Sequence, residues 1–372
     1  MDFSFSDEQR QLRDSVRSYL RDHYPFARRR AASLSAAGYD AATWGDFAER
    51  LGILSLADTG NAPDPVDVMV IMEELGEALV IEPFLETVVV GAALLRAAGG
   101  AAARTLLSGV VAGDVRLALA WAEPAARMAW MPRGTVARRE GDGWRLDGAK
   151  SVVTGAPWAT QLLVSAATAG GTSLFVVAPD APGVTLTAYP TIDGRRAADI
   201  VFDGAMLSGD ALLGGEGGAL PLLEAVGDAA IAAQSAEAVG VMRRMLRDTI
   251  DYTKQRQQFG QAISGFQALQ HRMVDMFTQT EMASSAVYLA TLKLGAPPAE
   301  RAMAASVAKV IVGEACGFVG QNAVQLHGGM GMTDDLAVGH YFKRATVIEG
   351  EFGTVDHHVA RFAAAQATSN AA

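Results

Sequence analysis

The hydrophobic residues in the first part of the chain have the spacing of helices. One apolar stripe, with a residue at every fourth position, consists of Leu12, Val16 and Leu20. Ser6 and Gln9 match the capping box that begins a helix. Further helices are predicted over residues 66–79 and 85–98, the second ending at a glycine pair. Residues 1–115 are therefore expected to form a helical domain.

The pattern changes over residues 116–213, where short apolar runs are separated by glycine, proline and aspartate. The runs cover residues 117–121, 162–166, 174–178 and 184–187. Residues 139–146 have the pattern of a β-hairpin with its turn at 141–143. Apolar and polar residues alternate around Ile200 and Phe202, as in a strand with one buried face. This region is expected to be a small antiparallel β-domain.

The last region, residues 218–368, is helical again, and its helices are long. Their predicted spans are 219–255, 265–294, 298–327 and 336–366. Long helices joined by short connections favour an antiparallel four-helix bundle. The predicted fold class is therefore α+β, with a helical domain, a β-domain and a helical bundle in that order.

Composition and charge exclude some classes of binding partner. Half of the 372 residues are hydrophobic and the formal net charge is −10, with no dense basic run, which argues against nucleic acid or an anionic membrane as a partner. The short basic run at residues 28–30 is expected to lie on a solvated helix surface. The single cysteine, Cys316, is expected to be a buried structural thiol. With no signal peptide and no charge-free apolar stretch of about 18 residues, a cytoplasmic location is expected.

Several long segments resemble the acyl-CoA dehydrogenase family. The two most specific ones are residues 251–276, DYTKQRQQFGQAISGFQALQHRMVDM, and residues 325–345, QLHGGMGMTDDLAVGHYFKRA. The resemblance extends over the whole chain, from the N-terminal MDFSFSDEQRQLRDSVRSYL onwards. The tail LHGGMGMTDDLAVGHYFKRATVIEGEFGTVDHHVARFA most resembles the branch named pimeloyl-CoA dehydrogenase small subunit. It implies the same three-part fold, FAD as cofactor and an acyl-CoA as substrate.

The resemblance also assigns residues to the cofactor. It places Arg256 against the FAD of a neighbouring subunit, with Phe259 by the adenosine side. A guanidinium can hold a pyrophosphate by paired charge-assisted hydrogen bonds. The loop containing Gln325, Gly328 and Gly329 reaches the same neighbouring FAD in the family. Taken singly, the glycines would be an ordinary helix end.

Two segments of the family surround the flavin ring, and both are altered in this chain. The family's T-E-P-G-A-G-S-D corresponds to residues 122–129, where Glu123 and Pro124 remain but the hydroxyl, the glycines and the final acid are gone. The family's W-I-T-N-G corresponds to residues 152–156, where Thr154 remains as a candidate FAD contact and Val152 replaces the tryptophan. Val152 and Val153 are interpreted as ordinary strand residues. The resemblance thus implies a weakened ring pocket.

The family's catalytic glutamate is missing. That carboxylate removes the acyl α-proton while the β-hydrogen leaves as hydride. The two positions that the family uses for it correspond to Phe352 and Ala230, and Thr354, a further candidate FAD contact, follows the first of them. Glu351 is the candidate replacement base. If residues 336–366 were one helix, its side chain would point about 100° away from that of residue 352.

Two other acids lie near the vacant positions. They are Glu349 and Asp228, and each is interpreted as a solvated or helix-end carboxylate.

Three functions remain open from the sequence. The first is a base-lacking subunit that contributes FAD contacts to a homologous large subunit, as in a heterotetramer. The second is a self-sufficient homo-oligomeric enzyme with a relocated base. The third is a scaffold that binds acyl-CoA or a partner without flavin.

Overall fold

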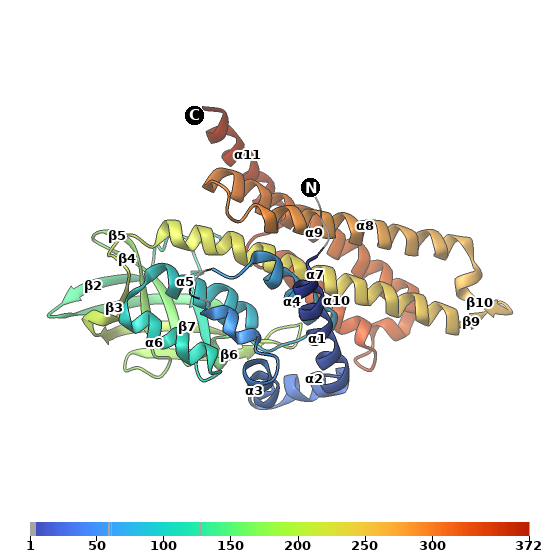
Figure 1. The fold of residues 1–372 in the computed structure, drawn as a ribbon, viewed down its shortest axis with the longest axis horizontal. Helices are drawn as coiled ribbons and strands as arrows, with labels where there is room; N and C mark the ends of the chain where they lie inside the picture. Colours follow the sequence, from blue (N-terminus) through green and yellow to red (C-terminus); the bar gives the residue numbers. More distant parts are fainter. Residues whose placement is uncertain (1–4, 59, 61, 127, 372) are drawn as a thin grey trace. The chain divides into compact units, whose positions relative to one another are not determined.

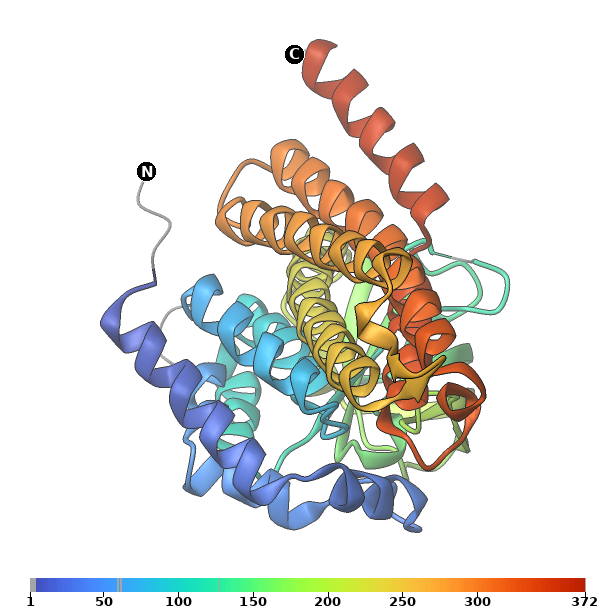
Figure 2. The same ribbon diagram turned by 90° about the vertical axis from the view of Figure 1, so that its right-hand side faces the viewer.

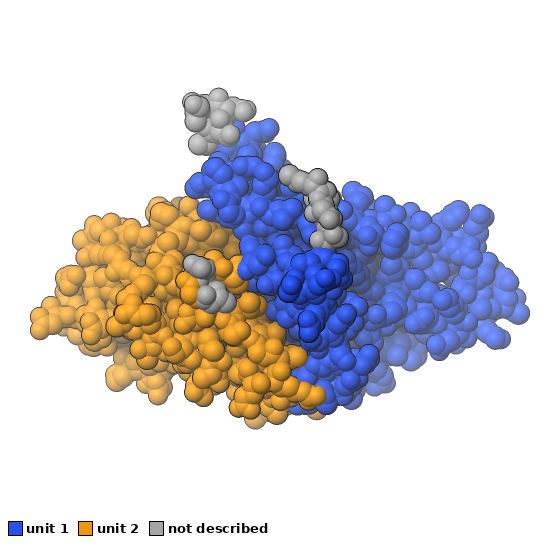
Figure 3. Space-filling model, viewed as in Figure 1, with its two compact units in different colours: residues 1–30, 64–80, 231–372 blue, residues 31–63, 81–230 orange. Residues whose placement is uncertain are grey.

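The computed structural model describes residues 5–58, 60, 62–126 and 128–371. The first four residues of the family-like N-terminal segment, and Arg127 of the altered loop 122–129, lie outside these ranges. The chain forms two compact units (Figure 3). Unit 1 comprises Met1–Arg30, Asp64–Val80 and Ile231–Ala372, and unit 2 comprises Ala31–Pro63 and Ile81–Ala230.

Unit 1 is helical (Figure 1). It contains α1 (Asp7–His23), α4 (Pro65–Glu77), most of α7 (Leu220–Gln255), α8 (Gln267–Leu292), α9 (Pro298–His327), α10 (Ala337–Gly350) and α11 (Val355–Ala371). The predicted capping box is confirmed, because the backbone amide of Gln9 donates to Ser6 Oγ (3.2 Å) and that of Ser6 donates to Gln9 Oε1 (3.1 Å). Helix α9 packs against α8, α10 and α11 (Figure 2).

The helix predicted over residues 336–366 is interrupted. It consists of α10 and α11, and the chain leaves helical geometry between them. Phe352 (φ 56°) and Gly353 (φ 120°) adopt positive φ values that no right-handed helix contains. The last of the four predicted bundle helices is therefore two helices with a sharp break.

The basic run 28–30 does not lie wholly on the surface as predicted. Arg29, on α2 (Phe26–Leu34), is only 1% exposed, and its Nε donates to the carbonyl of Leu79 (3.3 Å). Leu79 follows the end of α4 at a φ of 58°, where helix carbonyls need new donors. A buried guanidinium supplies that donor.

Unit 2 is built around one sheet. Its strands are β1 (Leu117–Ala120), β2 (Val136–Glu140), β3 (Gly143–Thr154), β4 (Gln161–Thr168), β5 (Gly171–Val177), β6 (Val184–Pro190), β7 (Arg196–Leu207) and β8 (Leu212–Leu213). Their order is β6-β7-β3-β2-β4-β5-β8, with β1 beside β4. The predicted hairpin is confirmed as β2–β3, where Glu140 pairs with Gly143 and Gly141 takes a φ of 58°. Its turn is thus one residue shorter than predicted.

The sheet is mixed rather than wholly antiparallel. Strand β4 pairs in parallel with β1, and at Val136 with β2. A long connection and the β2–β3 hairpin separate β1 from β4, so the chain can return in the same direction.

The helices of unit 2 depart further from the predictions. The segment predicted as one helix over 85–98 begins with a π-helix, Leu85–Gly91, and continues as α5 (Ala92–Ala98). A helix that was not predicted, α6 (Gly100–Val111), follows directly after Gly99. Helix α3 (Ala41–Glu49) was not predicted either.

Helix α9 has the length and apolar character of a membrane span. The segment concerned is Pro298–Met332, and more than half of its most apolar window is buried inside the fold. The core helix of a bundle has the same properties, so this signal is weak.

Candidate functional site

Arg256 and Phe259 lie on a short hairpin at one end of unit 1. Helix α7 ends at Gln255, and the hairpin consists of β9 (Gln257–Gln258) and β10 (Gln261–Ala262). Phe259 is 91% exposed at a φ of 52°. Arg256 is exposed, and among the described residues its side chain has no hydrogen-bonding or acidic partner. Both side chains are therefore available to a group outside this chain.

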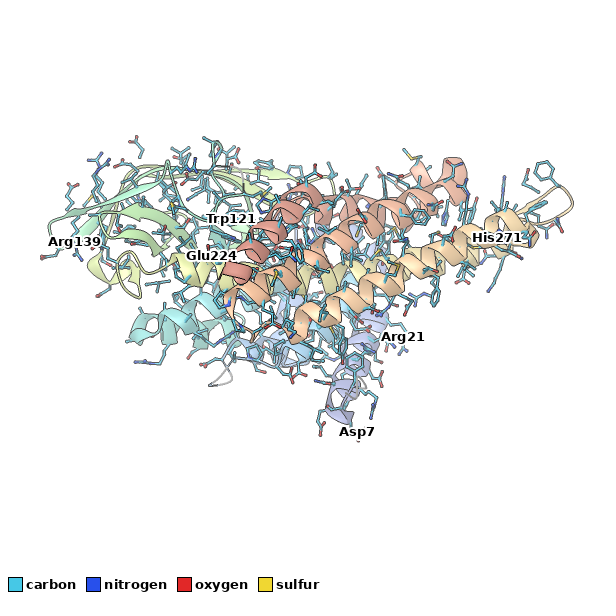
Figure 4. All side chains as sticks on the ribbon, turned by 90° about the horizontal axis from the view of Figure 1, so that it is seen from above. Asp7, Arg21, Trp121, Arg139, Glu224 and His271 are labelled. Carbon is cyan, nitrogen blue, oxygen red and sulfur yellow. The ribbon has the colours of Figure 1, made fainter. Side chains whose placement is uncertain are left out.

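Gln325 and the glycine loop lie at the same end of unit 1. Gly328, with a φ of 60°, ends α9, and Gln325, Gly328 and Gly329 are exposed. The ring of His327 stacks on Tyr252 of α7 at 4.4 Å, which holds the ends of α7 and α9 together. Figure 4 labels His271 of α8 close to the hairpin. Five of the predicted FAD contacts are thus gathered on one end of the bundle, and His327 is buried, in agreement with a structural role.

The two threonines in the predicted set lie in different units. Thr154 ends β3 in unit 2 and is partly buried. Thr354 is exposed in unit 1, where its Oγ1 accepts a long hydrogen bond from the amide of His357 (3.4 Å) at the start of α11.

The surviving Glu123 of the altered loop is buried within unit 2. Its carboxylate accepts hydrogen bonds from the amides of Arg133 (2.9 Å), Gly134 (2.7 Å) and Thr135 (3.0 Å). It also accepts one from Lys150 Nζ (2.9 Å). Burial by itself would raise the pKa of Glu123, but these donors lower it to about 2. Glu123 therefore stabilises the loop as a permanent carboxylate and is not directed at a ligand.

Lys150 is a residue whose role sequence reasoning missed. Its Nζ is fully buried and also donates to the carbonyl of Trp121 (3.1 Å) and to Ser165 Oγ (3.2 Å). Burial lowers the pKa of Lys150 to about 8, although Glu123 opposes that shift. The Glu123–Lys150 pair thus fixes both ends of the loop that follows β1.

Val152 is not the ordinary strand residue that was predicted. It lies at an irregularity in the pairing of β3 with β7, has a φ of 51° and is 59% exposed. A β-branched residue is disfavoured there, and strained backbone of this kind clusters at functional sites. Its amide donates to Asp199 Oδ1 (2.9 Å), which also accepts from the hydroxyl of Tyr189 (2.9 Å). The position that corresponds to the family's tryptophan thus has a strained backbone and an exposed side chain in this chain.

The position of Glu351 differs from the helical expectation. Glu351 caps α10 with extended backbone (φ −65°, ψ 140°), so a helical angle between residues 351 and 352 does not apply. Its carboxylate accepts from Arg344 Nη1 (3.1 Å) and from the amide of Gln234 on α7. Arg344 in turn binds Glu237 through two hydrogen bonds of 2.7 and 2.8 Å, and both side chains are 2% exposed. Glu351 therefore belongs to a largely buried ion network.

Two members of this network are close in sequence to the vacant base positions. Gln234 lies one turn after Ala230 on α7, and Glu351 directly precedes Phe352. Neither vacant position carries an ionisable group. Asp228, predicted to be solvated, is instead buried at 1% exposure.

Cys316 is buried as predicted. Burial raises the pKa of its thiol to about 12, so it is neutral and unreactive. In the part of the chain that the structure describes, no cluster of His, Cys, Asp and Glu could hold a metal ion.

His358 of α11 stabilises the break between α10 and α11 that contains Phe352. Its Nε2 donates to the carbonyl of Phe352 (3.0 Å), and in the neutral ring its Nδ1 accepts from Ser306 Oγ (3.3 Å). Burial lowers the pKa of His358 to about 4.

We expect this histidine to make unit 1 sensitive to acid. Between about pH 6.5 and pH 4 the unfolded chain binds a proton at residue 358 that the folded chain does not. His358 therefore contributes stability that is fully present above pH 6.5 and is lost as the pH falls towards 4, by up to about 3 kcal/mol. Urea unfolding at pH 7 and pH 4.5 measures the loss. The control His358→Asn should be destabilised at pH 7 but should lose less between the two values.

Models of the acyl-CoA dehydrogenase family match two parts of the chain. The family's middle domain matches residues 118–205, and its C-terminal domain matches residues 230–366. Among curated relatives, the probable acyl-CoA dehydrogenase FadE25 of Mycobacterium tuberculosis is 32% identical over 228 residues. That match covers 59% of this chain and 59% of the relative's length.

Solved structures match over almost the whole chain. The Tcur3481-Tcur3483 steroid ACAD G363A variant is 31% identical with a TM-score of 0.88, covering 98% of this chain and 99% of that one. A chain of the ChsE4-ChsE5 complex from M. tuberculosis is 25% identical with a TM-score of 0.89, and the match covers 99% of this chain and 99% of that one. A glutaryl-CoA dehydrogenase from Mycobacterium smegmatis in complex with FADH2 shares the fold at 22% identity and a TM-score of 0.86, covering 97% of this chain and 95% of that one.

The domain models, the order of helical and β regions, and a relative at 31% identity over nearly the full length agree. This chain belongs to the acyl-CoA dehydrogenase family.

Proposed function

We propose that this chain is the base-lacking subunit of a hetero-oligomeric, FAD-dependent acyl-CoA dehydrogenase that forms an α,β-unsaturated acyl-CoA. One contrast carries the proposal. Both positions for the catalytic base hold side chains that cannot accept a proton, Phe352 and Ala230. The side chains expected to reach a neighbour's FAD, of which Arg256 is the clearest, are kept and exposed. The resemblance to the branch named pimeloyl-CoA dehydrogenase small subunit agrees with this division of labour.

The residues exposed at the end of unit 1, where α7 and α9 end, are suited to bind the pyrophosphate part of FAD. FAD, when bound, accepts the β-hydrogen as hydride. The guanidinium of Arg256, which has no acid beside it, would hold the pyrophosphate by paired hydrogen bonds. The amide of Gln325 would donate and accept, and the exposed Gly328–Gly329 backbone would permit close approach.

Exposed apolar side chains on α8 and α9 are evidence for a partner subunit. They expose apolar side chains that a monomer would normally bury, namely Val274, Phe277, Met282, Leu289, Leu292 and Phe318. Such exposure on neighbouring helices is typical of a protein interface. The similar ChsE4-ChsE5 structure is a complex of two different chains. We propose a homologous larger subunit as the partner and a cytoplasmic location. We also propose a bulky acyl group on CoA, as the similar steroid ACAD structure suggests.

Absorbance spectroscopy tests the proposal. The chain purified alone should retain almost no flavin, whereas the chain co-purified with its large-subunit homologue should be yellow. Arg256→Ala should weaken FAD binding by the complex about tenfold or more, because it removes charge-assisted hydrogen bonds to phosphate. The control Arg138→Ala, on an exposed arginine of unit 2, should leave the flavin content unchanged. A complex without flavin would instead support the scaffold function.

The alternative is a homo-oligomer in which Glu351 is the base. The contacts of Glu351 with Arg344 and Gln234 favour a structural role, because both donors hold the carboxylate in place. Glu351→Gln is therefore expected to change the turnover of the complex by less than about threefold, far below the roughly 10²–10⁴-fold contribution of a general base. Anaerobic bleaching by acyl-CoA measures this, and its abolition in the variant would establish Glu351 as the base.

A further inference from the structure

The loop after β1 carries a tryptophan that the family resemblance does not account for. Trp130 packs on Trp121, with ring centroids 4.2 Å apart and planes inclined at 31°. Both rings belong to unit 2, and both are partly exposed. Figure 4 labels Trp121 and, on the first turns of α7, Glu224.

The ring of Trp130 also contacts the backbone of α7. A Cβ placed on Gly227 would lie only 2.2 Å from Cζ2 of Trp130, which is far inside van der Waals contact. The indole therefore rests directly on the helix at a buried glycine, and no ligand fits between them. Any larger residue at position 227 would displace the ring.

This contact lies beside a vacant base position. Gly227 and Ala230 are three residues apart, which makes them neighbours on one face of α7. A carboxylate at position 230 would act on an acyl α-carbon lying near that face. Here Trp130 occupies space on that face, one turn from Ala230 and within the same compact unit.

Both ends of this loop are anchored by hydrogen bonds. Lys150 Nζ donates to the carbonyl of Trp121, and Glu123 accepts the amides of Arg133, Gly134 and Thr135. Trp130 lies between these two fixed points, so its ring is positioned by the sheet of unit 2.

We propose that Trp130 is a steric plug, packed against Gly227, that keeps an acyl group away from the face of α7 that carries Ala230. The proposal rests on the proposed function and deepens it, since acyl-CoA would then be taken up only by the partner subunit. This apolar ring belongs to the same loop that lost the family's polar residues.

Binding of hexanoyl-CoA to the purified full chain tests the plug without requiring catalysis. By calorimetry the wild-type chain should bind weakly or not at all, and Trp130→Gly should bind at least tenfold more tightly. The control Met131→Ala, on the neighbouring side chain that is 52% exposed, should behave as the wild type. Tight binding by the wild type that weakens in Trp130→Gly would overturn the proposal, because Trp130 would then contact the ligand.

The contact between the Trp130 ring and Gly227 can be tested separately by thermal unfolding. Gly227→Ala should lower the melting temperature by several degrees, and adding Trp130→Gly should restore most of the loss. Independent, additive effects of the two changes would contradict the contact.

The two proposals fail differently. If the wild-type chain binds hexanoyl-CoA but cannot oxidise it, the steric-plug proposal is wrong and the proposed division of roles between two subunits still holds. If the wild-type chain oxidises acyl-CoA without a partner subunit, both proposals are wrong.

Discussion

Replacing Lys150 with methionine is expected to destabilise unit 2 by about 3–5 kcal/mol, since it leaves the Glu123 carboxylate buried without its counter-ion. The change also removes the donor to the carbonyl of Trp121, so the loop after β1 should loosen. Urea titration followed by tryptophan fluorescence measures the loss.

The double variant Glu123→Gln/Lys150→Met is the informative control. It removes both charges, and a buried ion pair exchanged for neutral groups often costs little. We expect it to be more stable than Lys150→Met alone. A single variant within about 1 kcal/mol of the wild type would show that the pair is unimportant.

The same pair predicts a dependence on acid. Because the pKa of Glu123 is lowered to about 2, its contribution is complete above its ordinary pKa, near 4.5. It is then lost as the pH falls from there towards 2. Glu123→Gln should flatten this part of the stability profile.

Replacing Arg344 with methionine is the second change with a large expected effect. Arg344 is 2% exposed and neutralises Glu237 and Glu351, so its loss leaves two carboxylates without their shared cation. The expected destabilisation of unit 1 is about 3–5 kcal/mol, measured by urea unfolding. The break between α10 and α11 should also become mobile, because Glu351 caps α10.

An ion pair of the same unit with a half-exposed arginine provides the control. Arg247 binds Glu77, but its side chain is 52% exposed, so Arg247→Met should cost no more than about 1 kcal/mol. Equal losses for the two arginine variants would mean that burial of the Arg344 network is not what makes it important.

Local features of the fold could be predicted from the sequence. The capping box at Ser6 and the β2–β3 hairpin depend on residues only a few positions apart, and both are present. The break at Phe352 was missed because the apolar spacing continues across it, while the conformation depends on positive φ at two successive residues. Likewise, Gly99 was correctly read as a helix end, but the helix that follows it was not predicted.

Roles for the candidate site residues came only from the resemblance and stay predictions. The exposure of Arg256 and Phe259 agrees with contacts to another subunit, but no spacing rule would have revealed it. The partners of Glu351 could not be predicted, since Gln234 precedes it by 117 residues. The contact of Trp130 with Gly227 has the same origin, because the fold brings together a loop and a helix that are distant in sequence.

The measurement that tests the division of labour most directly is anaerobic flavin bleaching by acyl-CoA. The chain alone, its large-subunit homologue alone, the complex, and the complex in which the homologue's catalytic glutamate is changed to glutamine should be compared. We predict rapid bleaching by the complex only, and its loss when the homologue's glutamate is changed. Bleaching at the full rate by this chain alone, with Phe352 and Ala230 in place, would contradict the account.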